Sequence, residues 1–449
     1  MDTKKLRQKI LDLAIRGKLV PQDPNDEPAS VLLERIRTEK ERLIKEGKIK
    51  RSKKSAATDK SHYENVPFEI PENWVWVTGN DIFNAMISCK PQGDEFKYID
   101  IDSIDNKNHR IISPKILKVK NAPSRASRYT QPGDVLFSMV RPYLKNIALV
   151  EEGSCIASTG FFVCSPMQLL TSEYCYYMML SDYVIYGLNQ YMKGDNSPSI
   201  NNGHITSWLY PIPPINEQLR ISAEIKKWFV FIDDLERGKI ELESLIKQVK
   251  STILDLAISG KLVPQDPNDE PAIELLKRIN PGFKPCDNSH YENLPQGWAV
   301  CRLEDILDYE QPQAYIVNNT DYSDEYDTPV LTAGKSFIIG YTNETNGICD
   351  RLPVIIFDDF TTDSKLVDFP FKVKSSAMKI LRTKGEINID YIAYYMSITR
   401  LIGDTHKRYW ISEYSKLLIP IPPYQEQLRI VDTIETIFNE ILKITAELS

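Results

Sequence analysis

The sequence predicts an α+β protein in which two α/β domains are separated by long antiparallel coiled-coil helices, in a near-circular arrangement with pseudo-twofold symmetry. Three observations predict this fold class. An apolar stripe runs along the central stretch 216–259, two sequence motifs each occur twice, and the two regions between the motifs mix β-type and helical patterns.

The apolar stripe predicts one long helix. Positions taken alternately four and three residues apart are apolar at ten of eleven sites, and this spacing keeps one side of a helix against a partner helix. At ~1.5 Å per residue the helix is a rod of roughly 66 Å, which suits a spacer. The positions are Ile221, Ile225, Trp228, Ile232, Leu235, Lys239, Leu242, Ile246, Val249, Ile253 and Leu256.

The doubled motifs predict two half-chains in tandem. ILDLAIRGKLVPQDPNDEPA at 10–29 recurs at 253–272 with one difference, Arg16 against Ser259. PIPPINEQLRI at 211–221 returns as PIPPYQEQLRI at 420–430. A weaker repeat pairs SHYENVPFEIPENW at 61–74 with SHYENLPQGW at 289–298.

The two ends of the chain together repeat the central helix. The repeats are offset by 253 − 10 = 243 and 420 − 211 = 209 residues, which aligns a C-terminal helix, 424–448, and an N-terminal helix, 3–16, with the central one. The aligned apolar positions are Leu6, Ile10, Leu13, Ile430, Ile434, Ile437, Ile441, Ile444 and Leu448. We therefore expect a second strut that packs antiparallel against the central helix and makes the molecule near-circular.

Turn residues separate the predicted segments. Gly17 and Gly260 can end the repeated helices in a left-handed cap, and the following prolines block continuation. A helix at 28–46 leads into the basic run 37–54, which is either a solvated linker or an arm that contacts phosphate. The predicted divisions are a helix, turn and basic linker at 1–61, α/β domains at 62–210 and 289–419, a helical region at 211–288 and a C-terminal helix at 420–449.

Each predicted α/β domain combines short strands in a mixed sheet with an aromatic, helix-like run before the Pro-rich exit. The helix-like runs are 173–186 and 389–402. The β-type runs are Val75–Val77, Val135–Val140, Ile147–Val150, Phe161–Val163, Val354–Phe357 and Phe369–Val373.

Composition narrows the function classes. The 449 residues carry a net charge of −7, which argues against a protein that coats nucleic acid indiscriminately. The sequence has no apolar run of membrane-spanning length and no signal peptide, so we expect a cytoplasmic protein. Seven dispersed cysteines without a Cys-x-x-Cys pair fit reduced thiols and no metal framework.

Two short strings resemble enzyme motifs but lack a required residue. Thr-Ala-Gly-Lys-Ser at 332–336 resembles the end of a phosphate loop, yet Pro329 stands where the first glycine is needed. Ile-Pro-Pro-Tyr at 421–424 resembles an amino-methyltransferase motif, but Ile421 replaces the polar residue that would hold the target amine.

A metal or histidine centre is not favoured either. Asp358, Asp359 and Asp363 with Lys365 could suggest a metal nuclease, although a charged loop is the simpler interpretation. The five histidines are dispersed and form no zinc pattern. We therefore predict no catalytic residue and no metal site in this chain.

Positive, aromatic and amide residues alternate inside both domains and predict contacts with DNA, since Lys and Arg hold phosphates while Arg and Asn read base edges. For each residue taken singly, a surface charge or a satisfied loop amide is the alternative. The candidates are Arg125, Arg128, Arg141, Tyr143, Lys145, Lys193, Asn196, Ser197, Asn201, Lys335, Lys365, Lys407, Arg408 and Tyr409. The candidate coiled-coil and partner interface comprises Ile221, Ile225, Trp228, Ile232, Leu235, Leu242, Ile246, Val249, Ile253, Ile434, Ile437 and Ile441.

Three motifs resemble one known family. GKLVPQDPNDEPA at 17–29 and 260–272, Pro-Ile-Pro-Pro-x-x-Glu-Gln-Leu-Arg at 211–220 and 420–429, and GDVLFSMVRP at 133–142 are similar to those of type I restriction-modification specificity (S) subunits. The resemblance implies two target-recognition domains, each reading one half of a split double-stranded DNA sequence.

The resemblance also implies partners. Two methyltransferase (modification) subunits would dock on the helices, restriction-translocase subunits would join them, and AdoMet, ATP and Mg²⁺ would serve those chains rather than this one. Two alternatives stay open: a non-enzymatic scaffold without DNA readout, and an independent nuclease or methyltransferase. Sequence preference of the assembled complex, and activity of this chain alone, discriminate between them.

Overall fold

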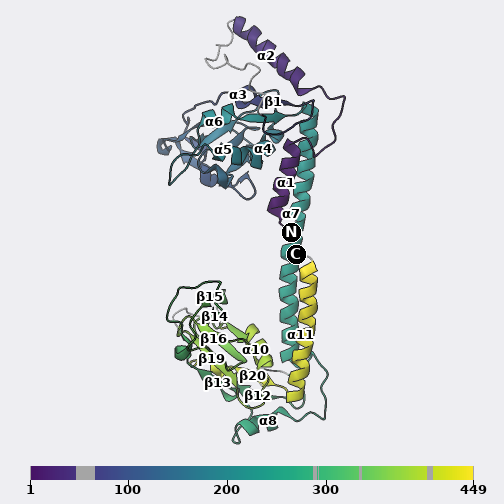
Figure 1. Cartoon of the computed structure of the whole chain (residues 1–449), viewed down its shortest axis with the longest axis vertical. Coiled ribbons are helices and arrows are strands. Elements are labelled where there is room, and N and C mark those ends of the chain that lie inside the picture. Colours follow the sequence, from purple (N-terminus) through teal and green to yellow (C-terminus); the bar gives the residue numbers. More distant parts are fainter. Residues whose placement is uncertain are drawn as a thin grey trace. The chain divides into compact units, whose positions relative to one another are not determined.

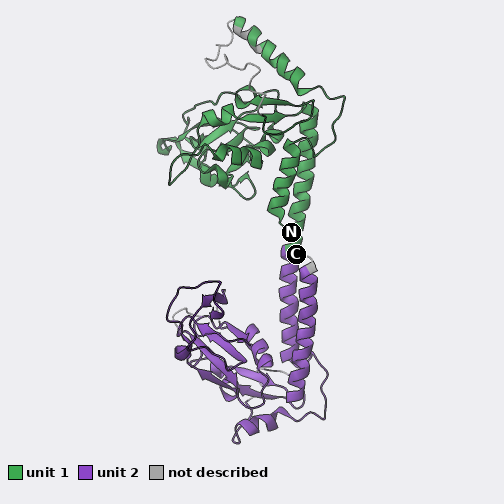
Figure 2. Ribbon diagram, viewed as in Figure 1, with its two compact units in different colours: residues 1–239 green, residues 240–449 purple. Residues whose placement is uncertain are grey.

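The computed structural model describes residues 2–46, 66–286, 291, 293–332, 336–401 and 408–447. The chain forms two compact units, 1–239 and 240–449, coloured separately in Figure 2. One helix, α7 (Ile215–Ile258), contributes residues to both units (Figure 1). The prediction of two α/β domains separated by one long helix is therefore confirmed.

Unit 1 combines small sheets with short helices, and its α/β part is called the first domain. Its helices are α1 (Thr3–Ile15), α2 (Ala29–Lys45), α3 (Gly79–Ile82), α4 (Ser172–Leu180), α5 (Asp182–Asn189) and α6 (Asn202–Ser207). Its strands are β1 (Val75–Thr78), β2 (Glu95–Ile99), β3 (Ile104–Asp105), β4 (Arg110–Ile111), β5 (Lys115–Lys118), β6 (Ala126–Thr130), β7 (Val135–Ser138), β8 (Ile147–Leu149), β9 (Cys155–Ser158), β10 (Phe161–Cys164) and β11 (Leu209–Ile212). The sheets are ordered β5-β2-β9-β6, β10-β7-β8, β1-β11 and β3-β4, and only the pair β2–β9 is parallel among them.

Unit 2 repeats this plan with its own α/β part, called the second domain. Its helices are α8 (Ala272–Ile279), α9 (Leu303–Ile306), α10 (Ile389–Ile398) and α11 (Tyr424–Glu447). Its strands are β12 (Ala299–Arg302), β13 (Leu307–Glu310), β14 (Thr328–Leu331), β15 (Ile338–Thr342), β16 (Val354–Asp358), β17 (Ser364–Val367), β18 (Lys372–Val373), β19 (Met378–Thr383) and β20 (Leu418–Ile421). The sheets are ordered β13-β19-β16-β17, β15-β14-β18 and β12-β20, with β14–β18 parallel, so both domains hold mixed pairings as predicted.

In unit 1 the N-terminal helix packs antiparallel against α7 (Figure 1). Arg7 of α1 lies 2.6 Å from the Asp233 carboxylate, and its guanidinium stands 5.1 Å from the centre of the Phe229 ring. Their shared core contains Ile10, Leu11, Ala14, Ile221, Ile225 and Ile232. This apolar contact explains why a short helix is stable beside a long one.

In unit 2 the C-terminal helix α11 packs antiparallel against the last turns of α7 (Figure 1). The Lys250 ammonium lies 4.9 Å from the centre of the Phe438 ring. The shared core contains Ile253, Leu254, Ala257, Ile430, Val431 and Ile434. The predicted joining of the two chain ends into a closed ring concerns the placement of the units and stays a prediction.

The buried side of α7 differs from the predicted stripe. Ile221, Ile225 and Ile232 are buried as expected, but Trp228 and Leu235 keep 39% and 36% of their surface exposed. Phe229, beside Trp228, faces α1 instead, because its ring stacks with Arg7. Phe229 follows Trp228 by one residue, ~100° around the helix, so the inner position shifts by one residue here.

Some predicted elements end early for local reasons. The run 173–186 is two helices, because Ser181 leaves helical geometry and its hydroxyl accepts from the Val184 N–H as the cap of α5. The run Phe369–Val373 contributes only the short strand β18. In unit 2 the helix that repeats α2 stops at Ile279, two residues before Pro281.

Both domains are built on one framework that the sequence comparison does not reveal. The first strand pairs with the last in each: Val75 with Ile212, and Ala299 with Ile421. The hydroxyl of Tyr174 donates to the Pro211 carbonyl at 2.9 Å. Tyr391 and Pro420 make the same bond at 2.8 Å in the second domain. The domains thus share one framework although their loops differ.

Candidate nucleic-acid interface

A buried glutamate begins the junction between each long helix and its domain. Glu217 of α7 accepts hydrogen bonds from Trp74 Nε1 at 3.0 Å and Gln22 Nε2 at 2.7 Å. Glu426 of α11 accepts from Trp298 Nε1 at 3.1 Å and Gln265 Nε2 at 3.0 Å. Burial raises the pKa of both carboxyls, against the lowering effect of these donors.

The neighbouring glutamine ties the helix to the main chain of the domain. Gln218 Nε2 donates to the Pro213 carbonyl at 3.0 Å, while its oxygen accepts from the Thr171 N–H at 2.8 Å. Gln427 makes the corresponding bonds with the Pro422 carbonyl at 3.0 Å and the Asn388 N–H at 2.9 Å. Both glutamines are fully buried, so these bonds satisfy amides that water does not reach.

The arginine of the same motif binds the turn that follows the other repeated helix. Arg220 Nη2 lies 2.6 Å from Asp26, and Arg429 Nη2 lies 2.6 Å from Asp269. The hydrogen bond from Arg220 lowers the pKa of Asp26. Because the two doubled motifs meet each other twice, we call each Glu-Gln-x-Arg segment with its Gln/Asp turn a buckle.

The leucine between the glutamine and the arginine is the one member of each Glu-Gln-Leu-Arg segment that points outward. Leu219 and Leu428 are 53% and 38% exposed. They occupy the same position of the two buckles, so the two units present equivalent apolar points beside equivalent turns.

Several predicted DNA-contact residues of the first domain lie together on two adjoining loops. The Arg141 guanidinium donates to the Asn196 carbonyl, and the Arg141 N–H donates to the Pro198 carbonyl at 2.8 Å. Lys193 and Ser197 lie on the same loop as Asn196, and all of these side chains are exposed. The structure thereby gathers a basic and amide-rich surface from residues about 50 positions apart.

Two further candidates border this surface. Tyr143 follows Arg141 on the same loop and is 44% exposed. Arg125 is exposed, and its carbonyl accepts from the Thr159 N–H at 2.9 Å; the adjacent Gly160 carbonyl accepts from the Met139 N–H at 2.8 Å. Arg125 therefore lies on a turn joined to the loop of Arg141 by main-chain bonds.

Two candidates of the first domain have structural partners, and a third is half-buried. The Lys145 ammonium lies 2.9 Å from Asp182 at the start of α5. Asn201 caps α6, because its side-chain oxygen accepts from the His204 N–H at 3.2 Å. Arg128 is half-buried in β6 and its Nε is buried without a hydrogen-bond partner among the described residues. Their contact with DNA stays a prediction.

The candidates of the second domain are more scattered. Lys365 of β17 stacks on Phe337, with its nitrogen 4.5 Å from the ring centre. Arg408 is exposed and lies over the Phe360 ring at 5.9 Å, whereas the neighbouring Tyr409 is buried in the core. Lys335 and Lys407 lie outside the described residues.

The acidic loop of the second domain is occupied by protein contacts. Asp359 is buried beside the Lys379 ammonium at 3.3 Å, and Asp363 lies 2.6 Å from Arg400. Asp358 accepts from the Phe360 N–H at 2.8 Å. No group of three potential metal ligands occurs among the described residues. These contacts support the charged-loop interpretation.

The predicted helix interface divides by exposure. Trp228, Leu235 and Val249 are exposed. The half-buried positions are Leu242, Ile246, Ile437 and Ile441, and the buried ones are Ile221, Ile225, Ile232, Ile253 and Ile434. The buried group holds each unit together, and the exposed group is available to another chain.

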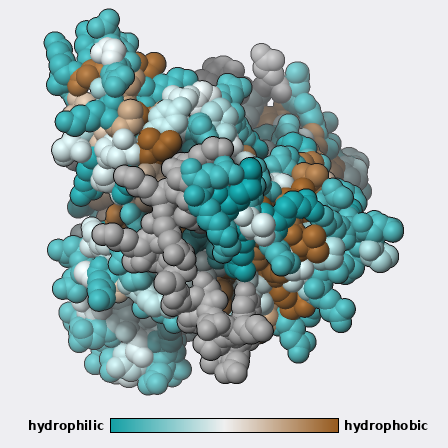
Figure 3. All heavy atoms as spheres, turned by 90° about the horizontal axis from the view of Figure 1, so that it is seen from above, coloured by the Kyte–Doolittle hydropathy of each residue, from teal (hydrophilic) through white to brown (hydrophobic). Residues whose placement is uncertain are grey.

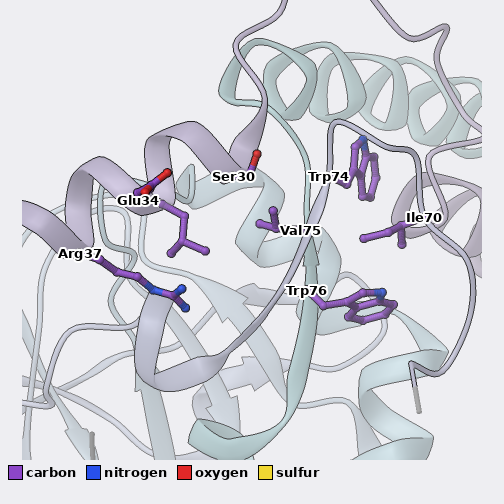
Figure 4. A pocket seen from close by; sticks show the side chains of 8 residues that line it. Ser30, Glu34, Arg37, Ile70, Trp74, Val75 and Trp76 are labelled. Atoms are coloured by element: carbon purple, nitrogen blue, oxygen red, sulfur yellow. The ribbon is translucent and has the colours of Figure 1, made fainter. Parts of the chain in front are cut away.

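A groove of about 560 Å³ lies between α2 and β1 (Figure 4). Its lining residues are Ser30, Leu33, Glu34, Arg37, Ile70, Trp74, Val75 and Trp76. Its polar lining side chains outside the tryptophans are Ser30, Glu34 and Arg37.

The outer surface is mostly hydrophilic on the face seen in Figure 3, where apolar side chains form small separate groups. Among the helices that the structure describes, none has the length and apolar character needed to cross a membrane.

Two matched buckles, two unlike α/β domains and a basic loop surface define a two-domain recognition protein.

Comparison with known proteins finds similarity to one family. Residues 295–449 match the type I restriction modification DNA specificity domain. The type I restriction enzyme EcoAI specificity subunit of Escherichia coli is 30% identical over 380 residues, covering 70% of this chain and 64% of that protein. The chain is therefore similar to type I restriction-modification specificity subunits, and it spans just under two thirds of that relative's length.

Solved structures show the same fold. One chain, described in connection with complex assembly and conformational transition of the type I R-M system, has a TM-score of 0.63 at 23% identity over 85% of this chain and 94% of its own. The HsdS subunit from Thermoanaerobacter tengcongensis has a TM-score of 0.52 at 22% identity over 85% of this chain and 93% of its own.

Proposed function

We propose that this chain is the DNA sequence-specificity subunit of a type I restriction-modification complex. Each α/β domain reads one half of an asymmetric, bipartite DNA target. The long helices set the spacer between the halves and dock two methyltransferase subunits. The carrying observation is that two domains with one framework and identical buckles bear unlike surface loops.

The unlike loops account for an asymmetric target. The first domain presents Arg141 with Lys193 and Asn196, whereas the second presents Arg408 beside Phe360. Because the side chains beside the two arginines differ, the two domains select different base sequences in the major groove. One target half then belongs to each domain.

The matched buckles account for two copies of one partner. Leu219 and Leu428 are exposed at the same position beside the same turn sequence. A protein that recognises one buckle recognises the other, and this gives pseudo-symmetric docking. Partner chains would also supply phosphate contacts that an acidic chain of net charge −7 lacks.

The chemistry of methylation and cleavage belongs to the partners in this proposal. AdoMet would bind the methyltransferase subunits, and ATP and Mg²⁺ would serve the restriction-translocase subunits. This chain would act by positioning DNA, as a cytoplasmic subunit without catalysis of its own.

The test is a domain exchange read out by methylome sequencing. Residues 62–210 are replaced by the first domain of another specificity subunit, and the variant is expressed with its methyltransferase partner. The modified motif should change in one half and keep the other half and the spacer. A change in both halves would contradict separate reading, and a complex that methylates without sequence preference would instead support a scaffold.

A further inference from the structure

The shared framework extends into the loops that the sequence comparison cannot align. In the first domain Ser138 of β7 pairs with Phe161 of β10. In the second, Asp358 of β16 pairs with Met378 of β19. The residue after each strand makes the same next bond: Met139 N–H to the Gly160 carbonyl at 2.8 Å, and Asp359 N–H to the Ala377 carbonyl at 3.0 Å.

The carbonyl of that same residue accepts a hydrogen bond from the final segment of each domain. The Ile200 N–H donates to Met139 at 3.0 Å, and the Tyr409 N–H donates to Asp359 at 2.9 Å. The separation of Ile200 and Tyr409, 409 − 200 = 209, equals the offset of the Pro-Ile-Pro-Pro repeat. Two independent registers therefore match the loops residue by residue.

These registers identify one crossing point in each domain, which is the place where the segment after the strand meets the final segment of the domain. In the first domain Val140 forms a β-bridge with Ser199. Adding the offsets, 140 + 220 = 360 and 199 + 209 = 408, gives Phe360 and Arg408, which contact each other through the ring and the guanidinium at 5.9 Å. The crossing point is thus the same place in both folds, built from different residues.

A guanidinium stands at each crossing point. In the first domain it belongs to Arg141, next to Val140, and the Asn196 carbonyl holds it. In the second it belongs to Arg408, and the Phe360 ring, 36% exposed, supports it. No carboxylate forms an ion pair with either arginine in the part of the chain that the structure describes, so the outward N–H groups are available to a ligand.

A buried ion pair supports the second crossing point. Asp359 lies 3.3 Å from the Lys379 ammonium and accepts from the Trp410 N–H at 2.8 Å. Both segments that carry Phe360 and Arg408 are therefore tied to one buried carboxylate. The corresponding residues of the first domain are Met139 and Phe162, so apolar packing instead of an ion pair supports the crossing point there.

We propose that the crossing point is the base-reading position of each domain, with Arg141 and Arg408 each contacting a guanine edge, and with Phe360 positioning Arg408. This inference rests on the proposed function. A guanidinium whose orientation the protein already restricts matches the O6 and N7 acceptors of guanine with two parallel N–H donors. A lysine keeps the charge but lacks this fork.

The test uses the complete complex with its methyltransferase subunits, the Arg408→Lys and Arg141→Lys variants, and duplexes in which each target base pair is replaced in turn. Arg408→Lys should lower affinity for the native target by roughly 5- to 150-fold and abolish discrimination at one G·C pair. The affected pair should lie in one half-site for Arg408→Lys and in the other for Arg141→Lys. Phe360→Leu should weaken the same pair that Arg408→Lys affects.

Salt dependence separates base reading from phosphate binding. The slope of log affinity against log salt concentration should stay unchanged in Arg408→Lys. Uniform weakening on all duplexes in Arg408→Ala, with a slope reduced by about 1, would overturn the inference by making Arg408 a phosphate contact. An effect of both variants on one half-site, or no effect, would overturn it as well.

The matched control is Arg302→Lys, since Arg302 is an exposed arginine of the second domain outside the crossing point. It should leave all discrimination unchanged. If the unmodified complex itself shows no sequence preference, the proposed function fails. If the unmodified complex is specific and Arg408→Lys keeps the same discrimination at every base pair, the crossing-point inference alone fails.

Discussion

At the residue scale, the two buckle glutamates are carboxylates held in a protein interior by neutral donors. Burial raises the pKa of Glu217 above its usual value, while the ion pair with Arg220 lowers that of Asp26 close by. The two acids therefore contribute to stability with opposite pH dependence.

We predict this opposition in unfolding experiments. Because the folded pKa of Glu217 is raised, its contribution to the free energy of unfolding is full below about pH 4.5 and falls as pH rises through the folded pKa. Glu217→Gln should remove this fall, so its stability relative to the unmodified chain should increase with pH. Urea denaturation across this range measures the difference; parallel curves would contradict it.

Asp26→Asn is the matched control. Its folded pKa is lowered, so its contribution is present above about pH 3.8 and is lost as pH falls through the folded pKa. The loss of stability in Asp26→Asn should therefore be largest near neutral pH and vanish in acid.

The buried pair Asp359–Lys379 gives a second residue-scale prediction. Asp359→Ala should lower the free energy of unfolding by about 3–5 kcal/mol, because it leaves the Lys379 ammonium buried without its counter-charge and the Trp410 N–H without its acceptor. Glu440→Ala, which breaks an exposed pair with Lys443, should cost less than about 1 kcal/mol. Equal losses in urea denaturation would contradict the role assigned to Asp359.

At the element scale, the ends of the repeated helices depend on glycine. Gly17 and Gly260 have φ of +66° and +68°, and a Cβ at Gly260 would lie 2.3 Å from Pro295 Cγ. The cap packs on Pro295 and on Trp298, which donates to the buckle glutamate Glu426, so backbone conformation and side-chain contact are set together there.

Gly260→Ala should therefore destabilise unit 2 by at least about 1–2 kcal/mol, from the left-handed backbone alone. Gly238→Ala is the matched control, because a Cβ there would meet nothing within 4 Å on α7. That variant should stabilise the helix by about 0.5–1 kcal/mol. Thermal denaturation of both variants compares the signs, and a loss in Gly238→Ala would contradict an undistorted α7.

The sequence predicted the elements whose cause is side-chain periodicity or repetition. It predicted α7 within one residue at each end, as well as the glycine caps. It did not reveal the framework common to the two domains, because main-chain groups carry it: Met139 and Asp359 make the same bonds with unlike side chains.

The candidate DNA-contact residues were likewise predicted only in part. Charge alternating with amides selected Arg141 and Asn196 as separate candidates, and it gave no sign that the fold brings them together. The same pattern placed Tyr409 at the surface, whereas the structure buries it, since adjacency to a charge does not report burial. Phe360 was missed; an aromatic residue within an Asp/Thr loop after a wholly apolar strand is the signal that points to it.

At the scale of the whole molecule, α7 is the proposed ruler. Inserting seven residues of helix-forming sequence after Gly238 lengthens α7 by about 10.5 Å and nearly restores its rotation, since seven residues are close to two turns. At ~3.4 Å per base pair the methylated motif should gain about three spacer base pairs with both half-sites unchanged. The methylome of cells carrying the variant measures this, and an unchanged spacer would refute the ruler role.

The identical buckles carry a last consequence. Each socket that receives a domain is made of the same Glu, Gln and Arg groups, and each domain offers the same tryptophan and tyrosine anchors. The sockets are therefore interchangeable, and a chain carrying the first domain in both would read one half-site twice. New specificities can then arise by exchange of whole domains, without any change to the buckles that hold them.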